Sequence, residues 1–298
     1  MLKILHVSDL HIGKSGERTE QAKELLAKID SRYAVSKKSS RSYLLITGDV
    51  VDVGTAQNVQ TALRILGKFT EKIIIVPGNH DCSGTLPALK DLALRIIRLV
   101  LPVIPGFFYN DDSAKRFDNV LVRGVGIGHA FFADPNPFCW LLPDASNPEA
   151  CVLGVNSCVK LEIGSSLGLI GYRQLTLLKS ELAINYGIPK IVGLHHRPEG
   201  GGSSFFMTLQ DWQDLIDIAQ NRASVLAFGH EGPMDQIKDR NLRAQIEANR
   251  VMEVRSLPET LSSGKNLYLL DADRSIVEQA WYVITVDGGS VSVAKENG

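Results

Sequence analysis

The sequence predicts an α/β protein in which buried strands and amphipathic helices alternate. Short continuous apolar runs, such as 43–46 and 73–76, are typical of strands buried inside a sheet. In the segment 22–29, by contrast, apolar residues recur at the i, i+3, i+4, i+7 spacing of a helix. Because the two patterns alternate along the chain, we expect βαβ units around a buried sheet.

The remaining elements are predicted from the same two patterns. Apolar runs indicate strands at 4–7, 120–125, 151–155, 190–194 and 224–228. Helical periodicity indicates helices within 59–66, 175–182 and 209–219. Strand-like stretches also occur at 267–270, 281–286 and 290–294, with a hairpin-type turn sequence at 287–289. We therefore expect the tail, residues 240–298, to supply strands that complete a second sheet.

The middle of the chain has a different composition. Residues 126–150 include a proline-rich, aromatic segment without a helical or strand period, which predicts a long loop insertion. Its aromatic part, 131–142, is compatible with two roles, a cap over an active site or a contact in a homodimer. Since no internal repeat or low-complexity linker divides the sequence, we expect a single domain over residues 1–298.

Bulk composition excludes several classes of protein. The 32 basic and 33 acidic side chains nearly cancel, so nucleic acid is not a favoured partner. The most apolar segment, 92–104, contains two arginines and a proline and is shorter than the roughly 20 residues of a membrane span. The start MLKILHVSDLH lacks the features of a secretion signal, and the four cysteines lack CxxC spacing. These observations predict a cytoplasmic protein with reduced thiols and no membrane partner.

Polar clusters follow five of the apolar runs, at the points where the predicted strands end. In open α/β sheets the carboxyl ends of neighbouring strands converge on one crevice, so residues distant in sequence can meet there. The clusters contain Asp9 and His11; Asp49; Asn79, His80 and Asp81; His195 and His196; and His230.

These residue types suit a catalytic site for divalent transition metals. Imidazole nitrogen with carboxylate or amide oxygen is a common donor set for such ions, and no thiolate takes part. Asp9 and His11, two apart on an extended segment, point to the same side and can bind one ion together. Asp49 follows a glycine and could bridge two ions. Two such ions activate water without a protein nucleophile.

His80 has a predicted role beside the metals. It can donate a hydrogen bond or a proton to the phosphoryl or leaving oxygen, with Asp81 or Asp52 as the carboxylate that orients its ring. Four strand-end histidines beside acidic and amide partners are unlike isolated histidines such as His6 and His129, for which we expect structural roles.

Together these motifs resemble the calcineurin-like metallophosphoesterase family. DLH at 9–11 matches its DxH, GDVVD at 48–52 its GDxxD, and GNHD at 78–81 its GNHD. The resemblance implies a four-layer α/β/β/α sandwich with two packed mixed sheets and the metal site at the carboxyl ends of the strands. It also implies that one ion is held by Asp9, His11 and Asp49, and the other by Asp49, Asn79, His195 and His230.

A second set of residues is similar to the cyclic-nucleotide phosphodiesterase branch of that family. HHRP at 195–198 resembles its HHxP segment, whose first histidine binds metal, so we assign His195 as the ligand with His196 as the alternative. Asn156 and Ser157, followed by a helix that begins near Gly171, extend the resemblance. His196 and Arg197 are candidates for contact with the substrate, although an arginine at this position is also compatible with a solvated surface residue.

The last motif departs from the family pattern. GHEG at 229–232 places Gly232 where the family has a second histidine that completes the first metal site. The resemblance therefore implies a first site that is weak or empty, or that is completed by water, Glu231 or Asp235.

These expectations define the functional hypothesis. The chain is expected to be a hydrolase that uses two divalent ions (Mn, Fe or Zn) to hydrolyse a phosphodiester, with a cyclic nucleotide as one candidate substrate. The alternatives are a DNA-repair-type nuclease of the same family, and a non-catalytic scaffold with an impaired metal site.

Overall fold

The computed structural model describes residues 1–84, 108–125, 128–158, 168–184, 187–197, 209–220, 222–230, 267–272 and 274–298. Two five-stranded mixed sheets form its centre. The apolar segment 92–104 and the candidate ligands Glu231 and Asp235, together with Gly232, lie outside the described residues.

The first sheet has the strand order β12-β11-β1-β2-β3. Its three parallel strands are β1 (Leu2–Val7), β2 (Ser42–Thr47) and β3 (Ile73–Val76). β11 (Ala280–Asp287) runs antiparallel to β1, and β12 (Ser290–Asn297) antiparallel to β11. The residues of β2 and β3 are all buried, which explains their continuous apolar sequences.

The second sheet has the order β10-β9-β8-β7-β6. Four strands are parallel: β7 (Ala150–Gly154), β8 (Lys190–Gly193), β9 (Val225–Phe228) and β10 (Tyr268–Asp271). β6 (Phe138–Leu142) pairs antiparallel with β7. A short ladder of β4 (Ser83–Gly84) and β5 (Phe108–Tyr109) lies beside the two sheets.

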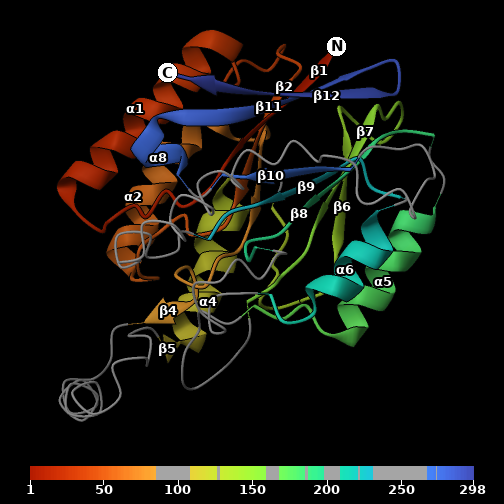
Figure 1. Cartoon of the computed structure of the whole chain (residues 1–298). Helices are drawn as coiled ribbons and strands as arrows, with labels where there is room; N and C mark the ends of the chain where they lie inside the picture. The colour runs from red at the N-terminus through yellow and green to blue at the C-terminus, as the bar shows by residue number, and fades with distance from the viewer. Residues whose placement is uncertain are drawn as a thin grey trace, which may run out of the picture.

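Helices cover the outer face of each sheet (Figure 1). α1 (Gly16–Tyr33) and α2 (Ala56–Leu66) contribute to the core on one side of the first sheet, where Leu25 and Val59 pack on strand residues such as Ile46. Both helices start at a side-chain cap, Ser15 for α1 and Thr55 for α2.

A second helical layer covers the other sheet. α5 (Tyr172–Ala183) and α6 (Trp212–Ala219) pack on its outer face through residues such as Leu178 and Leu215. A third core fills the space between the two sheets and includes Leu45, Val152 and Ile284. The three cores therefore lie between four successive layers: helices, the first sheet, the second sheet and helices. This arrangement confirms the expected four-layer α/β/β/α sandwich.

Four smaller helices are also present among the described residues. They are the 3-10 helix Gly67–Phe69, α4 (Asp111–Arg116), the π-helix Phe117–Val122 that continues α4, and α8 (Ser275–Glu278). None of the described helices combines the length and apolar character needed to cross a bilayer.

The expected strand at 120–125 is wrong, because residues 120–124 are helical and residue 125 lies in a turn. Leu121, Val122 and Val125 are buried together with Phe117, and this spacing places one face of a helix against the core. A short apolar run contains too few residues to show whether its period is that of a strand or of a helix. Its conformation is then decided by the part of the core against which it packs.

The expected loop at 126–150 contains a strand, β6. Trp140 and Leu142 of β6 turn towards the core between the sheets, whereas Cys139 and Leu141 pack on the outer core. Because β6 is an edge strand, the proline that follows it costs no ladder hydrogen bond.

The strands of the tail are present, but they divide between the sheets. β10 joins β9 in the second sheet, whereas β11 and β12 extend the first sheet beyond β1. The expectation that residues 240–298 complete one second sheet is therefore corrected to a tail that contributes to both.

Candidate metal centre

The chemistry-bearing residues gather beyond the carboxyl ends of strands from both sheets. Asp9, Asp49 and Asn79 follow β1, β2 and β3 of the first sheet, whereas His195 and His230 follow β8 and β9 of the second. Because the sheets pack face to face, the ends of these five strands meet at one edge of the sandwich. Each of the five residues is at most 8% exposed.

Backbone hydrogen bonds hold the loops of this centre in register. The amide of Asp9 donates to the carbonyl of Gly48 over 3.1 Å, and that of His11 to the carbonyl of Asp49 over 2.9 Å. The amide of Gly229 donates to the carbonyl of His195 over 3.0 Å. The amide of His230 also donates to Oδ2 of Asp9, over 3.0 Å, which links the two sheets through a carboxylate.

Four of the predicted ligands have a left-handed backbone conformation. The φ angles are 56° for Asp9, 45° for His11, 50° for Asp49 and 78° for His230. Residues with a side chain rarely adopt positive φ, and each instance costs of the order of 1 kcal/mol. The hydrogen bonds between the loops stabilise these conformations, which turn the side chains towards a common centre.

Two glycines allow the loops to approach each other. A Cβ atom on Gly48, whose φ is 91°, would lie 2.4 Å from Nδ1 of His195. A Cβ atom on Gly78 would lie 2.2 Å from the amide nitrogen of Asp49. The glycines of the GDxxD and GNHD motifs are therefore required by steric contact at the centre itself.

The donor atoms form two clusters that share Asp49. The central cluster consists of Asp49, His195 and His230, and the outer cluster of His11, Asp49 and His80. Within each cluster the potential ligand atoms lie within 4.8 Å of one another. A shared carboxylate is the arrangement expected for a bridge between two metal ions.

The central cluster is closely packed. Nε2 of His195 lies 3.5 Å from Oδ2 of Asp49, 3.0 Å from Oδ1 of Asn79 and 3.0 Å from Nδ1 of His230. Nδ1 of His195 donates to the carbonyl of Thr47 over 2.9 Å, so Nε2 faces Asp49 and Asn79, where it offers a lone pair once it has lost its proton. This convergence of potential ligand atoms fits a bound cation, and the assignment of His195 as a ligand stays a prediction.

The outer cluster is wider. Nε2 of His11 lies 3.7 Å from Oδ1 of Asp9 and 3.8 Å from Oδ2 of Asp49. Nε2 of His80 lies 3.9 Å from the same Oδ2 of Asp49. These separations leave room for an ion with metal–ligand distances of about 2.0–2.2 Å.

Burial and neighbouring charges shift several pKa values in the centre. Burial alone would raise the pKa of Asp49, but the charges of His195 and His80 hold it well below its usual value. Burial would lower the pKa of His195, and Asp49 and Asp9 instead raise it to about 9, so a metal ion must displace a proton from this ring in order to bind. Burial lowers the pKa of His230 to about 3 and raises that of Asp9 to about 6. The central carboxylate is therefore ready for a cation, and His230 is neutral as a ligand must be.

The carboxylate of Asp81 does not have the expected role of orienting His80. Its two oxygens accept hydrogen bonds from the amides of Val51, over 3.0 Å, and Gly78, over 2.8 Å. Asp81 thus fastens the loop that carries Asn79 to the loop that carries Asp49. Burial and the charge of Asp49 raise the pKa of Asp81 to about 7.

The ring of His80 is oriented by Asp52, chiefly through the backbone. Nδ1 of His80 donates to the carbonyl of Asp52 over 2.7 Å, and the Asp52 carboxylate lies 3.8 Å from the same nitrogen. Since Nδ1 carries a proton, the neutral ring has its lone pair on Nε2, facing Asp49. His80 can therefore donate from Nε2 only as the imidazolium.

The other two substrate-binding candidates are differently placed. Nδ1 of His196 is 2.8 Å from the hydroxyl of Ser157, and its ring lies 4.6 Å from the ring of His230, so His196 borders the central cluster. Nη1 of Arg197 pairs with Oδ2 of Asp271, at the end of β10, over 3.3 Å. This ion pair gives Arg197 a structural contact that the sequence did not indicate.

Sequence reasoning missed the residues that support the ligands. Arg18 of α1 is 9% exposed and its guanidinium donates to the carbonyl of Asp9 over 3.0 Å. Ser8 donates to the carbonyl of Thr47 over 2.8 Å. From the sequence alone, an arginine at the start of an amphipathic helix cannot be told from a solvent-exposed one. Only its burial in the structure distinguishes Arg18.

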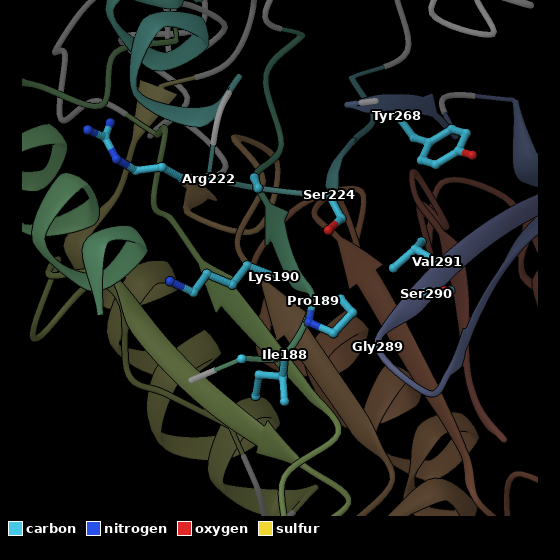
Figure 2. A pocket seen from close by; sticks show the side chains of 11 residues that line it. Ile188, Pro189, Lys190, Arg222, Ser224, Tyr268, Gly289, Ser290 and Val291 are labelled. Atoms are coloured by element: carbon cyan, nitrogen blue, oxygen red, sulfur yellow. The ribbon is translucent and has the colours of Figure 1, made fainter. Parts of the chain in front are cut away.

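A separate pocket of about 420 Å³ lies at the opposite, amino-terminal ends of the second sheet's strands. Figure 2 shows its lining, where Lys190 and Arg222 extend away from Gly289 and Ser290 of the β11–β12 turn. Nζ of Lys190 donates instead to carbonyls at the end of α5, including that of Leu182. The polar groups do not converge, so this pocket lacks the chemistry of the metal centre.

Known proteins resemble this chain in sequence and in fold. The family profile described as calcineurin-like phosphoesterase matches residues 2–234. A probable cyclic nucleotide phosphodiesterase of Coxiella burnetii is 32% identical over 234 residues, covering 77% of this chain and 75% of the relative. A 3',5'-cyclic-nucleotide phosphodiesterase of a Nostoc species is 23% identical over 238 residues, covering 77% of this chain and 71% of the relative.

Among solved structures, a dimetal phosphatase from Danio rerio is similar with a TM-score of 0.50 at 12% identity, covering 99% of this chain and 98% of its own. At this identity the similarity concerns the fold. The family match extends over most of the chain and includes every predicted ligand. The protein therefore belongs to the calcineurin-like phosphoesterase family and is a hydrolase of phosphoester bonds.

Proposed function

We propose that the protein hydrolyses a phosphodiester, with a 3',5'-cyclic nucleotide as the substrate. The observation that carries the proposal is the pair of donor clusters that share Asp49. Similarity at 32% identity to a probable cyclic nucleotide phosphodiesterase supports the choice of a diester. When bound, two divalent transition-metal ions such as Mn, Fe or Zn supply Lewis acidity that activates water and offsets charge on the phosphate.

Each side chain has a defined task in this proposal. Asp49, Asn79, His195 and His230 hold one ion, and Asp9, His11 and Asp49 the other. His195 is suited to its task because Thr47 fixes its tautomer. His196, which borders the central cluster, lies where it can contact the substrate phosphate.

His80 is assigned the role of donating a hydrogen bond or a proton to the leaving oxygen or to the phosphoryl oxygen. Its ring is at the outer cluster with 14% of the side chain exposed, and Asp52 fixes its orientation. As the imidazolium it donates from Nε2, and general acid catalysis of this kind contributes about 10²–10⁴ in rate. Burial lowers the pKa of His80, although the charge of Asp49 and the hydrogen bond to the Asp52 carbonyl favour the protonated ring.

The test is a comparison of substrates with the metal-supplemented enzyme. The protein, supplied with Mn²⁺, Zn²⁺ or Fe²⁺, is assayed against bis(4-nitrophenyl) phosphate, 4-nitrophenyl phosphate, 3',5'-cyclic AMP, 3',5'-cyclic GMP and linear DNA. We expect the diester to exceed the monoester in kcat/KM, and a cyclic nucleotide to exceed linear DNA. Preference for the monoester, or for DNA, would reject the proposed substrate, and no turnover with any metal would reject the catalytic proposal.

A further inference from the structure

Two thiols meet on the outer face of the second sheet, on strands that carry none of the proposed metal ligands. Sγ of Cys139 on β6 lies 2.6 Å from Sγ of Cys151 on β7. In the antiparallel register Cys139 is opposite Leu153 and Cys151 is opposite Leu141, so the two cysteines are diagonal neighbours on one face. Both pack in the core beneath α5.

The two sulfur atoms are close to bonding distance. A disulfide has an S–S length of about 2.05 Å, and the thiols are within about 0.6 Å of it. The strands that carry the two thiols are joined by their ladder over residues 138–142 and 150–154. All four cysteines of the chain are unbridged in the structure.

The two thiols differ in access and acidity. Cys139 is partly exposed, and the hydrogen bond from Cys151 holds its pKa below the usual value. Cys151 is 1% exposed, and its hydrogen bond to Cys139, together with burial, raises its pKa. Burial and the charge of Glu181 oppose the thiolate of Cys139, whereas the charge of Lys190 favours it. An accessible attacking thiol beside a buried second thiol is the arrangement of a resolving pair.

We propose that Cys139 and Cys151 are a site of reversible oxidation by low-molecular-weight disulfides. The Cys139 thiolate attacks one sulfur of the small disulfide, whose S–S bond breaks and releases one small thiolate. Cys151 then loses its proton and attacks the sulfur of Cys139, which expels the second small thiolate. The two cysteine protons end on the two small thiols. The two cysteines lose two electrons as their S–S bond forms, and the small disulfide gains these two electrons as it becomes two thiols.

The expected consequence is mechanical. The new bond closes a short loop between β6 and β7 and attaches the edge strand covalently to its only neighbour in the second sheet as described. Because the proposed ligands follow β1, β2, β3, β8 and β9, oxidation is expected to change stability and to leave turnover unchanged.

The experiment treats the full-length protein with oxidised glutathione, quenches it with iodoacetamide and maps its peptides by mass spectrometry. We expect a cross-link between the peptides that contain Cys139 and Cys151, and a rise in Tm of the order of 5 °C that dithiothreitol reverses. The Cys151→Ser variant should trap glutathione on Cys139. The Cys139→Ser variant should form no cross-link at Cys151.

Cys82 and Cys158 provide the matched control, because a double variant with serine at both positions should still form the cross-link. Free alkylation of both Cys139 and Cys151 after oxidation would overturn the proposal. So would a cross-link that disappears in the double variant, because the oxidised pair would then lie elsewhere. Glutathione trapped on Cys151 in Cys139→Ser, but not on Cys139 in Cys151→Ser, would reverse the assigned order and refute the mechanism.

Discussion

The central and outer clusters share Asp49 but differ in how closely they hold their donors. In the central cluster the nearest ring nitrogens are 3.0 Å apart and every member is buried. In the outer cluster the donor separations involving Asp49 are 3.8 and 3.9 Å, and His80 is partly open to solvent. The central donors are thus preorganised for an ion, and we expect that cluster to bind metal more tightly.

The largest effect is expected where the clusters meet. Asp49→Asn keeps the side-chain shape but removes the charge that both ions would share. We expect loss of both ions and a decrease in kcat/KM of at least about 10³-fold, equivalent to about 4 kcal/mol of transition-state stabilisation. Metal content and turnover measure this, with circular dichroism as the check on folding. A variant that still binds two ions would contradict the bridging role.

The role of His80 can be tested through the pH dependence of its contribution. Burial lowers the pKa of His80, and only the protonated ring can donate from Nε2, so the donor form is lost as pH rises. We expect His80→Gln to lower kcat by about 10²-fold at low pH, and by less as pH increases. The measurement is the wild-type to variant ratio of kcat across pH, at saturating metal.

A ratio that does not change with pH would contradict the donor role. In that case metal content decides between two readings of the same geometry. Loss of one ion from His80→Gln would show that the lone pair on Nε2 binds metal, whereas retention of both ions would assign the residue a neutral hydrogen-bonding role.

The unequal affinity of the clusters can be tested by removing one ligand from each. His195→Gln should weaken the tighter ion by at least about 100-fold, because even groups behind the ligands change affinity about 10–100-fold. His11→Gln should weaken only the looser ion and leave the tighter one in place. Calorimetric titration of the metal-free protein with Mn²⁺ resolves the two. Equal losses from the same ion in both variants would contradict the division into clusters.

The smallest expected effect concerns the departure from the family motif. Gly232→His restores an imidazole where the family pattern has one and should tighten the looser ion by about 10-fold. Gly232→Gln is the control for side-chain size. An unchanged affinity in Gly232→His would indicate that another residue already supplies the missing ligand.

The strands that carry ligands were predictable, since buried parallel strands have long apolar runs and their ends bear the polar motifs. The prediction of secondary structure failed where the local apolar pattern and the packing of the folded chain favour different conformations. Residues 120–124 are helical because Leu121, Val122 and Val125 meet the core as one helical face. β6 was not predicted because the sequence around it is aromatic and proline-rich. Its pairing with β7 is a tertiary contact that no local sequence pattern indicates.

The sequence by itself determined the α/β class, the family and the set of candidate ligands, because these depend on residue type and spacing. Only the tertiary structure decided how the ligands divide into two clusters around Asp49, and that Asp81 fastens a loop while the Asp52 carbonyl orients His80. It also brought Cys139 and Cys151 together. The physical reason is that hydrogen-bond direction and distance between strand ends depend on how two separate sheets pack, and local sequence does not encode that packing.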